Sequence, residues 1–222
     1  MVGKYVERFI LRRADMALAG NIDNMACVLR QGVHPERTAI IRIENSIDPS
    51  HFVALDKRES GVADLKALGV AGQKVLMCIS RLEPVKLCDH LVRALACLKG
   101  KGLNINTLFV GDGEARESLA KLAKELGVAD QITFCGNQNQ EWLTRVIPCT
   151  AVVVSPITGR ALAEAALGKA PIVAYNIDWH SEVIENGIPG ELVPHLNYSL
   201  MADAIEKIIN DEEYGQMIGA KA

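Results

Sequence analysis

The stretch VVVSPITGRALAEAAL, residues 152–167, decides the fold class of this chain. Its three valines are typical of a buried strand, its Ser-Pro-Ile-Thr-Gly segment indicates a tight turn, and its alanine-rich end predicts a helix from residue 160. A strand that ends in such a turn directs the N–H groups at the start of the next helix beyond the edge of the sheet, where they can bind an anion. The stretch therefore predicts a strand–turn–helix unit with a candidate anion site.

Arg160 leaves two interpretations of this turn open. A cation in the first turn of a helix opposes the helix dipole, and an anionic ligand would relieve that conflict. Alternatively, Arg160 pairs with Glu164 one turn later, and the unit is an ordinary strand–turn–helix. The residues of the stretch favour neither interpretation.

Strands and helices alternate on both sides of this unit. Apolar strands are expected at 74–80, 106–110, 131–135, 151–155, 171–174 and about 190–193. Helices are expected near 61–68, 87–100, 114–127, 139–147, 160–168, 179–186 and 198–210. This alternation predicts an α/β fold with a doubly wound parallel sheet, whose ligands bind beyond the carboxyl ends of the strands.

A smaller piece precedes this region. Residues 1–46 predict a helix at 4–13, a strand at 16–19, a helix at 21–31 capped by Asn21, and a strand at 38–43. Four elements are too few to fill a core, so we expect this piece to pack on the rest of the chain or on a missing N-terminal portion. Residues 47–57 lack a sustained period and contain Asp-Pro, which predicts a linker before a second domain at 58–222.

Composition and motifs give no sign of several classes of partner and cofactor. The chain has 222 residues and a formal net charge of −3, which gives no reason to expect nucleic acid or an acidic membrane as a partner. Its six cysteines are scattered without a C-x-x-C pattern, so we expect reduced thiols and a cytoplasmic protein. No metal-binding motif is present in the sequence, and no metal or other cofactor is expected.

The turn after the strand at 74–80 carries two cations. Arg81 and Lys86 stand five residues apart, and together they suit a diphosphate, which the arginine binds as a fork and the lysine as a point charge. The alternative is a solvated loop in which Arg81 pairs with Glu83 or Lys86 pairs with Asp89. Taken by itself, this turn favours the solvated loop.

Two further turns follow the next strands. Gly111-Asp112-Gly113 is a tight turn at which a ligand could approach the backbone of Gly111, but Arg116 occupies the sixth position of what would be a dinucleotide fingerprint. Asn137 and Gln138 could read the edge of a nucleobase. Asn139 could equally serve only to cap the following helix.

The remaining polar residues form no recognisable catalytic arrangement. No pairing of a serine or cysteine with a histidine is evident, and we expect the five histidines to be structural or exposed. Asp178-Trp179-His180 follows the fifth strand and could border a site. The favoured interpretation is that Asp178 caps the next helix while the Trp179 side chain is packed.

Taken in order, these segments resemble the nucleotide-sugar-binding half of a GT-B glycosyltransferase of family four, the glycosyl transferases group 1. The matching segments are ISRLEPVK at 79–86, LFVGDGEARESLAKLAKELGVADQITFCGN at 108–137, SPITGRALAEAALGKAPIVAYN at 155–176 and SEVIENGIPGELV at 181–193. Near the start, RRADMALAG and IDPSHF resemble the end of the family's first lobe and its hinge. The fold implied is a Rossmann-like lobe preceded by part of a second lobe.

The resemblance also implies roles for individual residues. Arg81 and Lys86 would bind the diphosphate of a nucleoside-diphosphate sugar and stabilise the leaving phosphate, and Glu164 would accept hydrogen bonds from the ribose hydroxyls. The loop and helix start would meet the phosphates through backbone N–H groups at Gly159, Arg160, Ala161 and Leu162. Gly111, Asn137 and Gln138 would contact the nucleotide, the last two at its base. The implied reaction is a retaining, metal-independent sugar transfer.

Two departures from the family pattern limit this implication. The family's first glutamate, eight residues before Glu164, is replaced by Pro156, and the loop after it is shortened. Only the last elements of the first lobe are present, so we expect an inactive fragment that needs a missing N-terminal lobe or a partner chain. The acceptor is not indicated. The alternatives are a non-catalytic nucleotide or phosphosugar-binding module, and an epimerase or phosphorylase of the same architecture.

Overall fold

The computed structural model describes residues 2–41, 47–48, 50, 52, 58–70, 72, 74–157, 159–186 and 189–221. The chain divides into two compact units, Met1–Ser46 and Ile47–Ala222. Most of the linker expected at 47–57 lies outside the described residues, as do residues 42 and 43 at the end of an expected strand.

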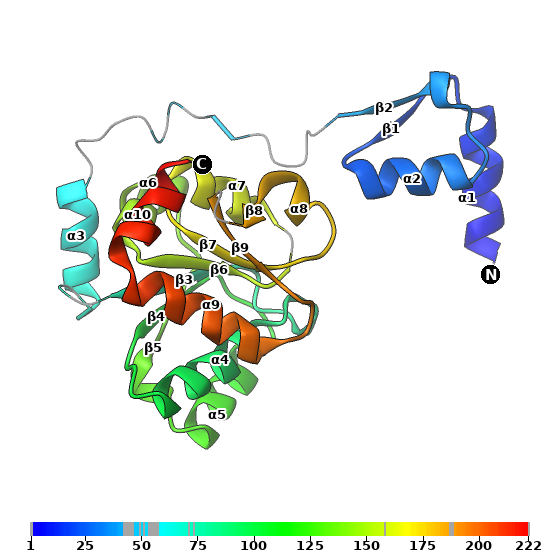
Figure 1. The fold of residues 1–222 in the computed structure, drawn as a ribbon. Helices are drawn as coiled ribbons and strands as arrows, with labels where there is room; N and C mark the ends of the chain where they lie inside the picture. Colours follow the sequence, from blue (N-terminus) through cyan, green and yellow to red (C-terminus); the bar gives the residue numbers. More distant parts are fainter. Residues whose placement is uncertain are drawn as a thin grey trace. The chain divides into compact units, whose positions relative to one another are not determined.

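The first unit is a small α/β piece (Figure 1). Its elements are α1 (Val2–Arg13), β1 (Ala17–Ala19), α2 (Ile22–Arg30), a 3₁₀ turn (Pro35–Arg37) and β2 (Thr38–Ile40). The two strands are parallel, and the predicted cap is confirmed because Asn21 Oδ1 accepts a hydrogen bond from the N–H of Asn24 at 2.7 Å. Tyr5, Phe9 and Ile10 on α1 are exposed. The described part of this unit therefore buries little apolar surface of its own.

The second unit is built on a seven-stranded sheet in the order β5-β4-β3-β6-β7-β9-β8, with every neighbouring pair parallel. The strands are β3 (Val75–Ile79), β4 (Asn106–Val110), β5 (Ile132–Gly136), β6 (Val152–Ser155), β7 (Ile172–Tyr175), β8 (Glu185–Asn186) and β9 (Pro189–Val193). The helices are α3 (Arg58–Ala67), α4 (Cys88–Gly100), α5 (Arg116–Glu125), α6 (Gln140–Val146), α7 (Arg160–Leu167), α8 (His180–Val183), α9 (Tyr198–Asn210) and α10 (Glu212–Ala220). The predicted doubly wound α/β fold is confirmed.

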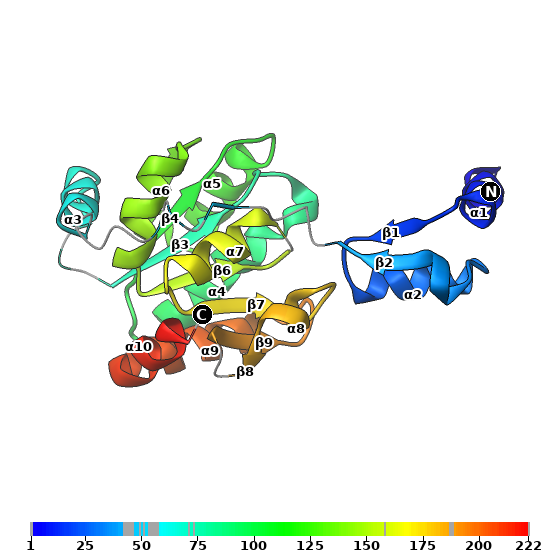
Figure 2. The ribbon, with the colours of Figure 1, turned by 90° about the horizontal axis from the view of Figure 1, so that it is seen from above.

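Both faces of this sheet are covered by helices, which is why its strands are apolar throughout. Along β3, Leu76 and Cys78 belong to a core cluster with α4, α5 and α9, while Val75 and Met77 belong to a second cluster with α3, α6 and α7. In Figure 1, α4 and α9 lie side by side on the first face, and Figure 2 shows α7 along strand β6 on the other.

The strand order reverses at β3, which has β4 on one side and β6 on the other. At such a switch point the connections from two neighbouring strands leave toward opposite faces, and a crevice opens beyond their carboxyl ends. The two segments that stand out in the sequence, residues 80–86 and 156–161, follow β3 and β6. The topology therefore brings them to the same crevice.

Two local expectations are wrong. The helix expected at 179–186 ends at Val183, because the next residues pair with β9 as strand β8. Asp178 does not cap α8: the N-cap residue is Trp179, without a side-chain cap, and Asp178 has a left-handed φ of 46°. Trp179 does pack against the second core cluster, as predicted.

Helix α10 was not expected, because Gly215 and Gly219 weaken its helical signal. The fold needs Gly219 for packing, since a Cβ there would stand 2.3 Å from the carbonyl oxygen of Lys169. Among the described residues, no helix is both long enough and apolar enough to cross a membrane.

Candidate functional site

A cavity of about 320 Å³ opens at the carboxyl edge of the sheet, between the turns that follow β3, β4, β5 and β6. It is lined by Ile79, Ser80, Arg81, Lys86, Val110, Gly111, Asn137, Gln138, Leu143, Ile157, Gly159, Arg160, Ala161 and Glu164. Nine of the ten residues predicted for the site are in this set. The exception is Leu162.

Glycine backbone holds the first two turns together. Gly111 has a φ of 128°, and a Cβ on it would stand 2.0 Å from the carbonyl oxygen of Ser80, so only glycine fits this approach. The Leu82 N–H donates to the Asp112 carbonyl at 3.0 Å, and the Ala115 N–H donates to the Leu82 carbonyl at 2.8 Å. These contacts hold the segment that carries Arg81 against the turn after β4.

Arg81 is paired in this structure and still faces the cavity. Its Nη1 lies 2.7 Å from Glu83 Oε1, so the Arg81–Glu83 pair expected for a solvated loop is formed. The arginine side chain is 70% exposed, and exposed pairs of this kind contribute about 0–1 kcal/mol, so an anion could displace Glu83 at small cost. Lys86 ends the 3₁₀ turn Pro84–Lys86, which places it on the cavity wall.

The start of α7 forms the opposite wall. Gly159 is the N-cap residue, and no side chain caps this helix among the described residues. Leu162 was predicted to meet a phosphate through its N–H group. This is wrong, because its N–H donates to the Gly159 carbonyl at 3.1 Å and its side chain is fully buried in the second core cluster. The first-turn residues that line the cavity are Arg160 and Ala161.

Arg160 forms the pair with Glu164 that one of the two interpretations of the sequence expects. Arg160 Nε lies 3.2 Å from Glu164 Oε1, and both residues line the cavity. A second contact runs from Arg160 Nη2 to Gln140 Oε1 at 2.8 Å. Burial raises the pKa of Glu164, whose side chain is 5% exposed, and the Arg160 charge and the Gln140 amide oppose this shift. The carboxylate is thus desolvated and held by a guanidinium.

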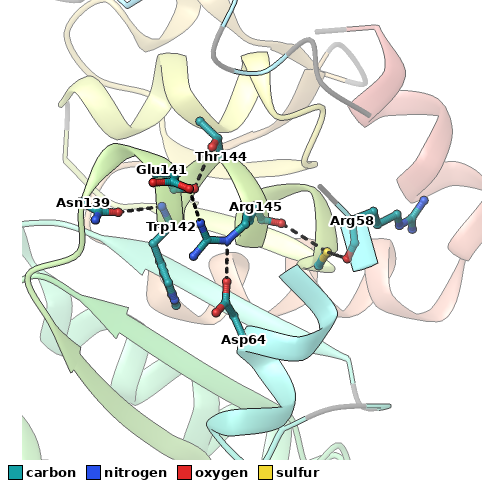
Figure 3. Close-up of polar contacts among 8 residues, drawn as sticks. Arg58, Asp64, Asn139, Glu141, Trp142, Thr144 and Arg145 are labelled. Carbon is teal, nitrogen blue, oxygen red and sulfur yellow. Dashed lines mark hydrogen bonds and ion pairs between the residues drawn. The ribbon is translucent and has the colours of Figure 1, made fainter. Parts of the chain in front are cut away.

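The amide-rich turn after β5 divides its residues between two roles. Gln138 Nε2 donates to the Cys135 carbonyl at 2.7 Å, and Asn137 is exposed at the rim of the cavity. Asn139 Oδ1 accepts a hydrogen bond from the Trp142 N–H at 2.8 Å, so its predicted capping role is confirmed (Figure 3).

Helix α6, which supplies Gln140 and Leu143, is anchored by α3. Arg145 Nε lies 2.9 Å from Asp64 Oδ2 on α3 and its Nη1 lies 3.1 Å from Glu141 Oε1 (Figure 3). A Cβ on Gly61 would stand 2.1 Å from the Arg145 carbonyl oxygen, so the two helices are in backbone contact. This contact fixes the wall of the cavity from which Gln140 reaches Arg160.

Sequence reasoning missed the apolar wall and Ser80. The cavity is also lined by Ile79, Val110, Leu143 and Ile157; the first two end strands β3 and β4, and Ile157 stands two residues after the end of β6. That position was the available signal. Two histidines match the structural role expected of them: His90 Nδ1 lies 2.7 Å from Tyr175 Oη, and His180 Nδ1 lies 2.6 Å from the Tyr175 carbonyl oxygen.

The family model of the glycosyl transferases group 1 matches residues 64–222, which include the whole cavity. The chain belongs to this family. An alpha-D-kanosaminyltransferase of Streptomyces kanamyceticus is 27% identical over 158 residues, which are 69% of this chain and 41% of the relative. A D-inositol 3-phosphate glycosyltransferase of Mycobacterium marinum is 30% identical over 216 residues, 95% of this chain and 45% of the relative. The chain spans less than half of the length of these curated relatives.

Solved structures support the same fold. The crystal structure of Anabaena Alr3699/HepE in complex with UDP-glucose superposes with a TM-score of 0.86 over 99% of this chain and 61% of that chain, at 23% identity. A sucrose-phosphate synthase of Thermosynechococcus elongatus superposes with a TM-score of 0.83 over 99% of this chain and 55% of that chain, at 21% identity. The second unit is thus the Rossmann-like lobe of a GT-B fold.

Acidic residues are scarce on the cavity wall of this member of the glycosyl transferases group 1. Glu164 is the only acidic residue among the described residues that line the cavity. Pro156, which stands where the family pattern places a glutamate, is buried and does not line it. The cavity wall therefore combines three cations with one carboxylate.

Proposed function

We propose that this chain is the donor-binding part of a retaining glycosyltransferase, which moves a sugar from a nucleoside-diphosphate sugar to an acceptor. One observation carries the proposal: a single cavity at the switch point brings Arg81, Lys86 and the start of α7 together with the buried carboxylate of Glu164. Cations and helix N–H groups suit a diphosphate, and a desolvated carboxylate suits neighbouring hydroxyls.

In this proposal Arg81 and Lys86 neutralise the charge that develops on the leaving diphosphate. The N–H groups of Arg160 and Ala161 act in the same direction, because the positive end of the α7 dipole faces the cavity. No group of three or more metal-ligating side chains occurs within the described part of the chain. We assign the charge stabilisation to the cations and N–H groups of the protein and propose a metal-independent reaction.

The remaining residues of the site would orient the nucleotide. Glu164 would accept hydrogen bonds from the ribose hydroxyls, and Asn137 and Gln138 would contact the base. The backbone of Gly111, which lines the cavity, would contact the nucleotide. Among the similar structures, that of HepE is a complex with UDP-glucose, and a similar protein of Mycobacterium tuberculosis is named a GDP-mannose-dependent mannosyltransferase. These names support a nucleotide-sugar donor and transfer of a hexose.

We propose further that transfer needs an acceptor lobe, supplied by a longer chain or by a partner chain. The described part of Met1–Ser46 leaves apolar side chains of α1 exposed, which favours such a partner. The 222-residue chain alone would then bind nucleotide without transferring sugar. All six cysteines are free, and we propose a cytoplasmic location on that basis.

Calorimetric titration of the 222-residue chain with UDP, GDP and ADP tests the donor site. We expect one of the three to bind, and we expect Arg81→Ala and Lys86→Ala each to weaken it about tenfold, the value of a lost charge-assisted hydrogen bond. Lys121→Ala is the matched control, because Lys121 pairs with Glu125 on α5 outside the cavity. A folded sample that binds none of the three at millimolar concentration refutes the proposal.

A second candidate is a nucleotide-binding module without catalytic activity. The burial of Pro156 favours this candidate, because among the described residues of the wall Glu164 has no second acidic group beside it that could contact the donor sugar. Transfer or slow donor hydrolysis separates the two functions when it is measured on the chain joined to an acceptor lobe. Catalysis that is lost in Glu164→Ala supports the transferase, and nucleotide binding without turnover supports the module.

A further inference from the structure

The contact between Arg160 and Glu164 lies inside the cavity and not on an open helix surface. Both residues line the wall, and the guanidinium is held from two sides, by Glu164 Oε1 at 3.2 Å from Nε and by Gln140 Oε1 at 2.8 Å from Nη2. Gln140 comes from a different helix. The guanidinium is therefore placed where a ligand that uses Glu164 must also lie.

The two partners of this pair differ in what they lose when it breaks. Glu164 is 5% exposed, so its carboxylate cannot turn to water and needs hydrogen-bond donors from within the cavity. The Arg160 side chain is 54% exposed, long and flexible, so its guanidinium can move at little cost. A hydroxyl-bearing ligand can thus replace the guanidinium, provided that its own O–H groups donate to the carboxylate.

The displaced guanidinium remains at the first turn of α7, where a cation opposes the helix dipole. A phosphate bound beside this turn would pair with it and remove the conflict. A diphosphate can bind Arg160 as a fork, with two parallel N–H···O bonds. A ligand that carries both hydroxyls and phosphate would therefore satisfy both members of the broken pair, whereas a ligand with hydroxyls alone would satisfy only Glu164.

We propose that Arg160 is a specificity-determining residue that exchanges its partner: it pairs with Glu164 in the unliganded chain and with a ligand phosphate once the ligand's hydroxyls bind Glu164. This inference rests on the donor site of the proposed function. The partner exchange should lower the affinity for nucleosides relative to nucleoside diphosphates, because a nucleoside breaks the Arg160–Glu164 pair and offers Arg160 no new partner. The ligand class is a nucleoside diphosphate, free or joined to a sugar.

The test compares a nucleoside with its diphosphate on the wild-type 222-residue chain and on Arg160→Leu. The pair used is uridine with UDP, guanosine with GDP or adenosine with ADP, whichever diphosphate binds the wild-type chain most tightly. We expect the variant to bind the diphosphate on the order of tenfold more weakly, because one charge-assisted contact is lost. The variant should bind the nucleoside about twofold more tightly than the wild-type chain does, because no i,i+4 ion pair has to be broken first.

Nucleoside binding is followed by NMR titration, which measures millimolar dissociation constants. Lys121→Leu is the matched control, since it removes an i,i+4 cation on α5 outside the cavity and should leave both affinities unchanged. The Arg160 Nε–Hε resonance gives an independent readout. It should shift on addition of the diphosphate to a position different from the one that the nucleoside produces.

Each result has a separate meaning. If Arg160→Leu weakens nucleoside and diphosphate by the same factor, or changes neither, the partner exchange is refuted while the donor site stands. If the wild-type chain binds no diphosphate, the proposed function fails, and the exchange fails with it. A selective loss for the diphosphate, together with unchanged or tighter nucleoside binding, supports the exchange.

Discussion

Replacing Gly111 by alanine should damage stability and the site together. This residue has a φ of 128°, a conformation that L-residues avoid, and its added Cβ would stand 2.0 Å from the Ser80 carbonyl oxygen. The backbone strain alone costs about 1–3 kcal/mol. Forcing the two backbones apart adds about 1–3 kcal/mol, as for an overpacked core. We expect a total loss of about 2–6 kcal/mol in the free energy of unfolding.

The control for this substitution separates the strain from the close approach. Gly127 also has a left-handed φ, of 69°, but no atom lies within 4 Å of its added Cβ. Gly127→Ala should therefore cost only the conformational penalty, about 1–2 kcal/mol. Both variants are measured by urea unfolding, with the slope checked to be unchanged so that the midpoint reports stability.

The second readout is nucleotide affinity. Movement of Ser80 in Gly111→Ala carries Arg81 with it, so the folded variant should bind nucleoside diphosphate at least tenfold more weakly, whereas Gly127→Ala should bind it normally. The reasoning is refuted if Gly111→Ala destabilises the chain no more than Gly127→Ala does. It is equally refuted if both variants keep the wild-type affinity.

Two further predictions follow from the walls of the cavity. Gly61→Ala should lower the free energy of unfolding by about 1–3 kcal/mol, because its Cβ would stand 2.1 Å from the Arg145 carbonyl oxygen. Gly100→Ala is the control: no atom lies within 4 Å of its added Cβ, so it should be neutral or slightly stabilising. Equal urea midpoints for the two variants would contradict the α3–α6 contact. Burial raises the pKa of Glu164 above that of an ordinary glutamate, so the protonated group contributes stability that is fully present below the unfolded-state pKa and is lost as the pH rises through the folded-state pKa. Relative to wild type, Glu164→Gln should therefore gain stability as the pH rises from the unfolded-state pKa through the folded-state pKa. Urea unfolding at a series of pH values measures this gain, and a difference in the free energy of unfolding that does not change with pH would contradict the prediction.

Helix and strand positions in the second unit were largely predictable from local patterns. The run of valines in β6 and the alanines of α7 carry signals that depend on neighbours along the chain. The failures came where tertiary contacts decide. The residues after Val183 join β9 as a strand, and α10 forms despite two glycines because Gly219 packs on the Lys169 backbone. No window of sequence contains those partners.

The residues of the site were predicted from their places after successive strands and from the order of the motifs. The sequence could not show which of these residues form hydrogen bonds or ion pairs with one another. Leu162 shows the limit: in the sequence it is one more residue of a helix start, but the twist of α7 turns its side chain into the core and its N–H toward Gly159. Whether Arg81 faces Glu83 or the cavity was open for the same reason.

By itself the sequence determined the alternation of strands and helices, the doubly wound class and the turns that carry cations, because these features follow from periodicity and from residue type. Only the tertiary structure decided that Gln140 holds Arg160 over Glu164 and that Gly111 touches Ser80. Those contacts join residues from different elements, and their geometry depends on strand order and on helix packing. The physical reason is that side-chain chemistry is local, whereas the distances that set pKa values, ion pairs and cavities are properties of the folded chain.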